Sequence, residues 1–513
     1  MLAPSEHGTL GRFLAHARTR PQAVAVRDER GELSYGALGA AARARAGALR
    51  AAGARRGSRI AVECGYGTDY IVALLASWLL EAVAVPMDPS SPADRRRQQV
   101  RQARCGTAVT GPRADGVVER AVAEVADAEV ADGAVADGAD GDEPEPAAYI
   151  LFTSGSTGAP KGVEVEHPAL LNMLDDLVRR LGLGPGDRML AHSNVVFDMS
   201  VPEMLMPLIS GGTVVVAPPR SARNPEFFAE WLRAHPVDAA WATPSQLGML
   251  LPFLHGERVF GALLSGGEAL PAALADDLWK VTGTLWNAYG PTEITVVGLC
   301  TEVLPPYRDP MPIGRPLTGL VAYVLDDRLR PVPHGSVGEL CLSGIGVARG
   351  YAGSPELTAR AFVTGPGGAR VYRTGDLVRV GPDGQHYFHG RRDDQVKIRG
   401  HRVELGEVEA VAQQAPFVRR AIAVLSDAVH GRSELYLAVT TEDAGDACVP
   451  ELRERLSRAL PAYMRPKRVL VFPELPRDTA GKTSRRAVRL LVDERLTGTP
   501  GPANHTTLEG RNG

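Results

Sequence analysis

Short apolar segments alternate with longer amphipathic or alanine-rich segments over the first part of the chain. Segments 23–27, 59–63 and 82–86 are short and apolar, which is typical of buried strands, whereas 37–52 and 68–80 have the length of helices. Strands that alternate with helices in this way favour α/β layers with a largely parallel sheet. We therefore predict an α/β fold for this part of the chain.

The alternation continues along the chain and indicates two domains. We predict a large N-terminal domain over residues 1–392, built of layered, mostly parallel sheets with helices, and a small, mobile C-terminal α+β domain over residues 393–495. Further strands are expected at 149–152, 188–191, 212–217, 239–242, 262–270, 420–425 and 434–439, and further helices at 9–17, 167–181, 404–413 and 449–460.

Two segments do not follow this pattern. Residues 115–146 repeat Ala, Asp, Glu, Val and Gly, which is typical of a variable, solvated acidic segment; an acidic interaction arm is the alternative. Residues 496–513 are rich in Gly, Pro, Thr and Asn, and we expect them to form a disordered tail. We place no catalytic residue in either segment.

Composition and charge narrow the class of protein. With 513 residues, of which 44% are hydrophobic, the chain can bury a large core. Its 57 Lys and Arg residues and 60 Asp and Glu residues leave a net charge of −3, so no basic excess points to nucleic acid. The cysteines lack paired or CxxC spacing, which predicts reduced thiols and no metal cluster. They are Cys64, Cys105, Cys300, Cys341 and Cys448.

The sequence contains no signal for export or for a membrane. The N-terminus lacks an apolar signal core, and the most apolar stretch, 70–80, ends at Glu81 and is far shorter than the ~20 residues that a bilayer requires. We therefore expect a cytoplasmic protein without a membrane partner.

The strand expected at 149–152 stops abruptly at a loop of hydroxyl groups, glycines and one lysine. Such a loop suits phosphate, because glycines let backbone N–H groups approach an anion while hydroxyls and an ammonium add donors and charge. It is not a Walker A loop, since Pro160 precedes the lysine and Gly162 follows it; a Ser/Gly-rich linker is the alternative. The residues assigned to phosphate are Thr153, Ser154, Gly155, Ser156, Thr157, Gly158 and Lys161.

The string 149–163 resembles the signature loop of the adenylate-forming enzymes, the superfamily of acyl-CoA ligases, luciferases and the adenylation domains of nonribosomal peptide synthetases. Strings similar to further motifs of this superfamily follow in the same order, so the resemblance runs from about residue 9 to residue 490. Since no carrier module follows, we expect a freestanding amino acid adenylation enzyme. The matching strings are 287–293, 338–351, 372–377, 390–409, 460–466 and 478–485.

The resemblance implies a site for ATP and Mg²⁺. Tyr289 is expected to stack on adenine, Thr292 to donate to the α-phosphate and Asp376 to bind the ribose hydroxyls, although Asp376 alone could be a turn cap. Glu293 is the implied Mg²⁺ ligand, because a carboxylate supplies hard oxygens, and Asp393 is the implied hinge. The other implied nucleotide contacts are Gly267, Glu268, Ala269, Asn287, Ala288, Gly290 and Arg391.

Two lysines are the catalytic residues that the resemblance implies. Lys482 lies on a short loop after an apolar strand, from which its ammonium could enter the active site, and Lys161 lies in the phosphate loop. The chain departs from the commonest family pattern at Ala480, where asparagine is more frequent.

The resemblance further implies that Asp198 binds the ammonium of an amino acid. A helix N-cap is the alternative, since Asp198 and Ser200 come just before Pro202. Besides Asp198, the implied pocket contains no acid or base except Lys482 at its mouth, so we expect an uncharged, mainly apolar substrate side chain. The pocket positions are Asp198, Met199, Pro202, Trp241, Leu264, Gly266, Ala288, Val296 and Val297.

Several functions remain open. The first is an enzyme of natural product biosynthesis, such as antibiotic biosynthesis, that forms an aminoacyl-AMP and loads the phosphopantetheine thiol of a separate carrier protein; the substrate could also be a β-amino acid. An acyl- or aryl-CoA ligase is the second, and a non-enzymatic nucleotide-binding protein, disfavoured by the catalytic lysines, is the third. An MbtH-like accessory protein is a further partner consistent with the resemblance.

Overall fold

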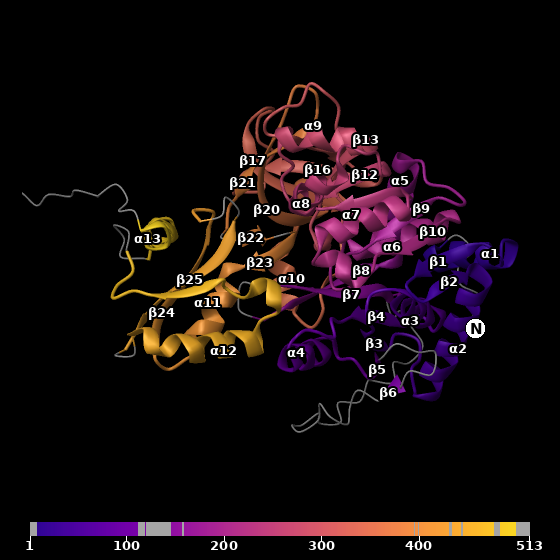
Figure 1. Cartoon of the computed structure of the whole chain (residues 1–513), viewed down its shortest axis with the longest axis horizontal. Coiled ribbons are helices and arrows are strands. Elements are labelled where there is room, and N and C mark those ends of the chain that lie inside the picture. The colour runs from indigo at the N-terminus through magenta and orange to yellow at the C-terminus, as the bar shows by residue number, and fades with distance from the viewer. Residues whose placement is uncertain are drawn as a thin grey trace, which may run out of the picture.

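The computed structural model describes residues 8–110, 118–119, 145–155, 159–393, 395–398, 400–429, 433–442, 445–476 and 483–498. Figure 1 shows a large N-terminal domain and a small C-terminal domain beside it, which confirms the predicted fold class. Most of the predicted acidic segment lies outside the described residues, as do Ser156, Thr157, Gly158, Lys482 and the tail from residue 499.

The strand before the phosphate loop, β7, lies inside a seven-stranded sheet. Its first six residues are buried, because an apolar run fits a strand that is covered on both faces, and the burial ends at Thr153, where the loop begins. β5, β3, β4 and β7 pair in parallel, as predicted, whereas β6, β8 and β18 pair antiparallel. The order is β18 (Gly350–Tyr351), β8 (Lys161–Glu166), β7 (Ala147–Thr153), β4 (Val83–Pro86), β3 (Arg59–Glu63), β5 (Thr107–Thr110) and β6 (Val118–Glu119).

The second sheet has 14 strands among the described residues, and the pairing of its strands changes from parallel to antiparallel midway. Neighbours from β1 to β13 are parallel, as predicted, whereas the half beyond β13 is antiparallel, so the mostly parallel prediction holds for one half only. The order is β16 (Leu320–Leu325), β17 (Val337–Gly344), β20 (Arg370–Val380), β21 (His386–Arg391), β15 (Pro312–Pro316), β14 (Leu299–Glu302), β13 (Thr282–Tyr289), β12 (Phe260–Gly266), β11 (Val237–Ala242), β9 (Arg188–Ala191), β10 (Thr213–Val216), β1 (Val24–Asp28) and β2 (Gly31–Ser34); β19 (Phe362–Thr364) pairs with β20.

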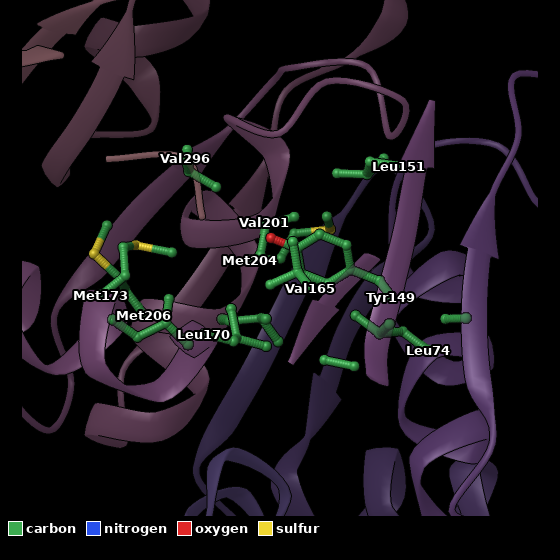
Figure 2. Packing of buried hydrophobic residues seen from close by; sticks show 14 of the residues in the cluster. Leu74, Tyr149, Leu151, Val165, Leu170, Met173, Val201, Met204, Met206 and Val296 are labelled. Atoms are coloured by element: carbon green, nitrogen blue, oxygen red, sulfur yellow. The ribbon is translucent and has the colours of Figure 1, made fainter. Parts of the chain in front are cut away.

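The main apolar core joins the two sheets through α3, α5 and α6. Figure 2 shows Tyr149 and Val165 of the seven-stranded sheet close to Val201 and Met204 of α6. Because every residue of α6 from Ser200 to Ile209 is buried, this helix has no solvent-facing side and is stable only inside this core. The helices are α1 (Thr9–Thr19), α2 (Tyr35–Ala51), α3 (Thr68–Leu79), α4 (Ala93–Ala103), α5 (His167–Leu181), α6 (Ser200–Ser210), α7 (Pro225–Ala234), α8 (Pro244–Leu254), α9 (Ala272–Val281) and α10 (Pro355–Ala361). Short 3₁₀ turns occur at η1 (Pro219–Ala222), η2 (Thr292–Ile294) and η3 (Pro366–Gly368).

The small domain contains a three-stranded sheet with helices and a separate hairpin. Its last helix extends to Thr497, so the predicted tail, which starts at residue 496, begins two residues too early. All five cysteines of the chain are buried and free, and no described helix has the length and apolar character needed to cross a membrane. The elements are β22 (Gln395–Ile398), β23 (His401–Glu404), α11 (Leu405–Gln413), β24 (Val418–Ser426), β25 (Glu434–Thr441), η4 (Gly445–Cys448), α12 (Val449–Ala459), η5 (Ala462–Met464), β26 (Arg468–Val471) and α13 (Arg485–Thr497).

Candidate active site

A cleft between the two domains brings together 13 of the 24 predicted site residues that the structure describes. It lies beyond the carboxyl ends of β7, β11, β12 and β13, the position where parallel sheets usually bind ligands. The predicted residues that line it are Thr153, Ser154, Asp198, Met199, Trp241, Gly267, Ala288, Tyr289, Gly290, Thr292, Val296, Asp376 and Arg391. The other described ones lie outside its lining: Gly155, Lys161, Pro202, Leu264, Gly266, Glu268, Ala269, Asn287, Glu293, Val297 and Asp393.

The predicted ribose acceptor, Asp376, is a buried carboxylate on β20. One of its oxygens accepts a hydrogen bond from the hydroxyl of Tyr289, and the other accepts one from Arg391, its partner residue on β21. Burial and the Asp376 charge raise the pKa of Tyr289, so its hydroxyl keeps its proton and remains a donor. Arg391 also binds Asp393, with its Nε 2.7 Å from Oδ1, so one guanidinium joins the ribose position to the predicted hinge.

The predicted magnesium ligand, Glu293, is fully buried. Burial alone would raise its pKa, but Arg402 of the small domain and the Tyr351 hydroxyl hold the pKa of Glu293 below its ordinary value. Its Oε2 lies 2.8 Å from Nη1 of Arg402, and its Oε1 accepts from Tyr351 at 2.8 Å. An ionised carboxylate with hard oxygens fits Mg²⁺, whose remaining ligands would come from phosphate and water. Arg402 contacts both oxygens of that carboxylate here, so Mg²⁺ at Glu293 would compete with this hairpin contact.

The described part of the phosphate loop lies against the small domain. The Ser154 hydroxyl donates to the backbone oxygen of Arg402 at 2.8 Å, and the N–H of Gly155 donates to Glu407 at 3.2 Å. Nζ of Lys161 lies 3.8 Å from Glu404. Small-domain groups therefore already bind donors that the sequence assigns to phosphate.

The side chains of Glu268 and Asn287, two of the predicted nucleotide contacts, bind backbone groups. Glu268 accepts the N–H of Gly400 at 2.6 Å and that of Ser245 at 2.9 Å, while Asn287 donates to the Pro312 oxygen at 2.7 Å. Ala269 is exposed. These two side chains therefore hold backbone segments around the cleft.

The nine predicted substrate positions combine one acid with mainly apolar residues, and five of them line the cleft. Asp198 accepts a hydrogen bond from Thr292, the residue predicted to contact the α-phosphate, at 2.6 Å, and burial raises the pKa of Asp198. The capping alternative is not supported, because α6 begins at Ser200 and no side chain caps it. The apolar pocket positions Met199, Trp241, Leu264, Ala288, Val296 and Val297 all belong to the main core, and Pro202 is buried within α6.

The hairpin β22–β23 is the part of the site that the sequence did not identify. Its charge-rich alternation is compatible with a solvated hairpin, yet Lys397 and Arg402 line the cleft, with Nζ of Lys397 5.9 Å from the centre of the Tyr289 ring. Gly400 has a positive φ, and a Cβ there would lie 2.4 Å from Thr243. Only glycine therefore permits this turn to approach the large domain so closely.

A buried ion pair also joins the domains. Arg95 of α4 and Glu407 of α11 lie 2.6 Å apart, with side-chain exposures of 7% and 0%. Beside them His401 stacks on Tyr463, with ring centres 4.1 Å apart, and meets Phe197 edge-on. Thr483, the residue after Lys482, contacts the small domain and not the cleft. Its hydroxyl accepts a hydrogen bond from Arg420 at 2.7 Å. The helix that follows, α13, lies at the far end of the small domain (Figure 1).

Comparisons with known proteins agree with this architecture. Residues 13–352 match the family described as AMP-binding enzyme, and residues 407–482 match its C-terminal domain. The chain is 36% identical over 462 residues to a dimodular nonribosomal peptide synthase of Bacillus subtilis, covering 85% of this chain and 19% of that protein. It is also 36% identical over 505 residues to phosphinothricin tripeptide synthetase PhsC of Streptomyces viridochromogenes, covering 94% and 45%. The chain thus spans less than half the length of these relatives.

Solved structures share the fold. IdnL1 superposes with a TM-score of 0.77 at 29% identity, covering 93% of this chain and 100% of that one. Holo-PA1221, an NRPS protein containing adenylation and PCP domains, superposes with a TM-score of 0.78 at 27% identity, covering 94% and 84%. Because the family model matches residues 13–352, more than half of the chain, the chain belongs to the AMP-binding enzyme family.

Proposed function

We propose that the chain activates an amino acid with an uncharged, mainly apolar side chain and transfers it to the phosphopantetheine thiol of a separate carrier protein. The observation that carries this proposal is Asp198, which faces the cleft next to an apolar pocket. A carboxylate there is useful for a substrate ammonium and has no evident use for a simple fatty or aromatic acid. A β-amino acid is the alternative substrate, since Asp198 could also bind a displaced ammonium.

The proposed reaction has two steps. In the first, an oxygen of the substrate carboxylate attacks the α-phosphorus of ATP, the bond to the β-phosphate oxygen breaks, and aminoacyl-AMP and pyrophosphate form. In the second, the thiol sulfur attacks the acyl carbonyl, loses its proton and displaces AMP. Lys161, Lys482 and the loop N–H groups would stabilise the negative charge of the first step. Mg²⁺ at Glu293 would add positive charge to the phosphates.

The contacts of the hairpin support a rotation of the small domain between the steps. Arg402 binds Glu293, and Glu407 binds Gly155, so the arrangement described here obstructs the metal and phosphate positions. We assign this arrangement to thiol transfer, with rotation about Asp393 bringing Lys482 into the cleft for adenylation.

ATP–pyrophosphate exchange, screened over amino acids, β-amino acids and simple carboxylic acids, tests the proposed function. Exchange is expected with uncharged amino acids. Exchange with simple acids alone would instead identify an acyl- or aryl-CoA ligase, and strong preference for Asp, Glu, Lys or Arg would show that the pocket is assigned wrongly.

Transfer to a carrier protein gives a separate prediction. Incubation of the enzyme with ATP, its amino acid and a phosphopantetheinylated carrier should increase the mass of the carrier by one aminoacyl group, measured by mass spectrometry. The assay should be run with and without an MbtH-like protein. Efficient transfer to free coenzyme A, with none to any carrier, would contradict the proposal.

Replacing Glu407 with glutamine is expected to slow thiol transfer by about tenfold or more, while adenylation keeps the parental rate. The substitution leaves Arg95 buried without its counter-charge, a cost that applies only where the two domains meet in this way. Transfer is measured from preformed adenylate, and adenylation by pyrophosphate exchange. The control is Glu454→Gln, which breaks the exposed pair with Arg458. An equal loss in both steps would show that the pair does not distinguish the two arrangements.

A further inference from the structure

Glu203 is a buried carboxylate that the proposed reaction does not use. It lies on α6 and is 0% exposed. Its Oε2 accepts the N–H groups of His192 and Ser193 and the hydroxyl of Tyr66, each at 3.0 Å, and its Oε1 accepts the hydroxyl of Ser193 at 2.6 Å. A carboxylate can be buried without a large free-energy cost only where hydrogen bonds replace its lost hydration. The four donors supply these hydrogen bonds, and three of them belong to two adjacent residues.

The segment 192–199 connects β9 to α6 and contains Asp198, the predicted ammonium ligand. Glu203 joins the two ends of this segment, because it lies in the first turn of α6 and binds the two residues that follow β9. At the helix end, the N–H of Val201 donates to the backbone oxygen of Asp198 at 3.0 Å. The backbone that carries Asp198 is therefore held from both ends.

His192 extends this network to a second residue of the cleft. Its Nε2 donates a hydrogen bond to the backbone oxygen of Trp241 at 2.8 Å, and its ring meets Phe228 edge-on, with ring centres 5.8 Å apart. Trp241 and Asp198 both line the cleft, and both are predicted substrate positions. Glu203 therefore holds the backbone at two substrate positions, although it does not itself line the cleft.

We propose that Glu203 is a positioning residue for the amino acid. It fixes the Asp198 carboxylate at the place where the substrate ammonium binds, and it acts through the backbone of segment 192–199 rather than by contact with the substrate. A carboxylate suits this position, because its two oxygens can accept several donors at once, whereas a hydroxyl or amide side chain has fewer acceptor sites. This inference rests on the proposed function, since it takes Asp198 to bind an ammonium.

Alanine in place of Glu203 is expected to raise the KM for the amino acid by about 10- to 100-fold. Without the carboxylate, the segment adopts arrangements in which Asp198 does not meet the ammonium, and the apparent affinity falls with the fraction of molecules that keep the competent arrangement. The KM for ATP should keep its parental value, because Tyr289, Asp376 and Arg391 bind one another and not Glu203. A variant that was only less stable would instead contain less active enzyme, which lowers kcat and changes neither KM.

The test measures kcat and both KM values by pyrophosphate exchange, and stability by thermal unfolding. Glu203→Gln is the conservative variant: its amide oxygen can accept the three donors at Oε2 while its NH₂ group donates to the Ser193 hydroxyl, so it should recover most of the affinity for the amino acid. Ser193→Ala and Tyr66→Phe form a matched pair, because each removes one hydroxyl donor from Glu203 but only Ser193 lies in segment 192–199. Ser193→Ala should raise the KM for the amino acid, and Tyr66→Phe should not.

The outcomes separate this inference from the proposed function. In Glu203→Ala, an unchanged KM for the amino acid, or an equal rise in both KM values, would overturn the inference and leave the proposed function standing. The same holds for a loss of affinity as large in Glu203→Gln as in Glu203→Ala, because hydrogen bonds to the segment would then not be the cause. Exchange by the parent with no amino acid would overturn both. Where Glu203→Ala does not fold, the matched pair decides, and an equal rise in KM in both of its members would overturn the inference.

Discussion

Alanine in place of Lys482 is expected to lower pyrophosphate exchange by several powers of ten. The resemblance places this ammonium on the reacting phosphate, and loss of such a contact in a water-excluded site costs about 3–5 kcal/mol. Lys482 lies outside the described residues, but the match to the C-terminal family model extends to residue 482. Thiol transfer from supplied adenylate should be largely retained, since the arrangement assigned to that step has other cations in the cleft.

The control for this prediction is Lys280→Ala, which removes a surface lysine paired with Asp277. It should exchange at the parental rate. A Lys482→Ala enzyme with parental exchange would refute the assignment of the catalytic lysine. Equal losses in exchange and transfer would refute the assignment of adenylation and thiol transfer to two different domain arrangements.

Asparagine in place of Asp198 is expected to reduce kcat/KM for the amino acid by about 10²- to 10³-fold. An amide cannot neutralise the substrate ammonium, and truncating one member of a buried charge pair costs about 2–5 kcal/mol. Carboxylic acids without an ammonium should not lose efficiency, because they do not need the charge. Asp277→Asn, on the surface of α9, is the matched control and should match the parent.

The pH dependence of kcat/KM tests the same residue. Burial raises the pKa of Asp198, so its carboxyl holds a proton over a wider range of acidic pH than an exposed aspartate does. The charged form that binds ammonium is present above the raised pKa and is lost as the pH falls through it. Efficiency with the amino acid should therefore decrease on the acidic side in the parent, and this decrease should be absent in Asp198→Asn. The same acidic decrease in both proteins would assign it to another group.

Local patterns predicted much of the fold, because strands and helices of this chain follow short-range periodicity. The predicted helix 167–181 and strand 188–191 agree with α5 and β9 residue for residue. The parallel prediction failed beyond β13, since antiparallel and parallel strands can have similar apolar runs and only the pairing distinguishes them.

Motif positions also predicted which residues gather at the cleft, as Tyr289 and Asp376 illustrate. Both residues lie on strands whose ends meet at the domain boundary. The position of each motif in the sequence therefore predicts that its residues lie at the cleft. The pairing of Asp376 with Tyr289 and Arg391 was not predictable, because a motif states residue types and not the partners of each oxygen.

The sequence by itself thus determined the fold class, the enzyme family and the candidate residues for nucleotide and ammonium. Only the tertiary structure decided that Arg95 meets Glu407, that Arg402 covers Glu293, and that Glu203 binds the two residues after β9. The physical reason is that hydrogen bonding and desolvation depend on which side chains meet after the chain has folded. Residues 95 and 407 lie on different domains. A periodicity within either segment shows which face of a helix is apolar, but it does not identify a partner so far away in the sequence.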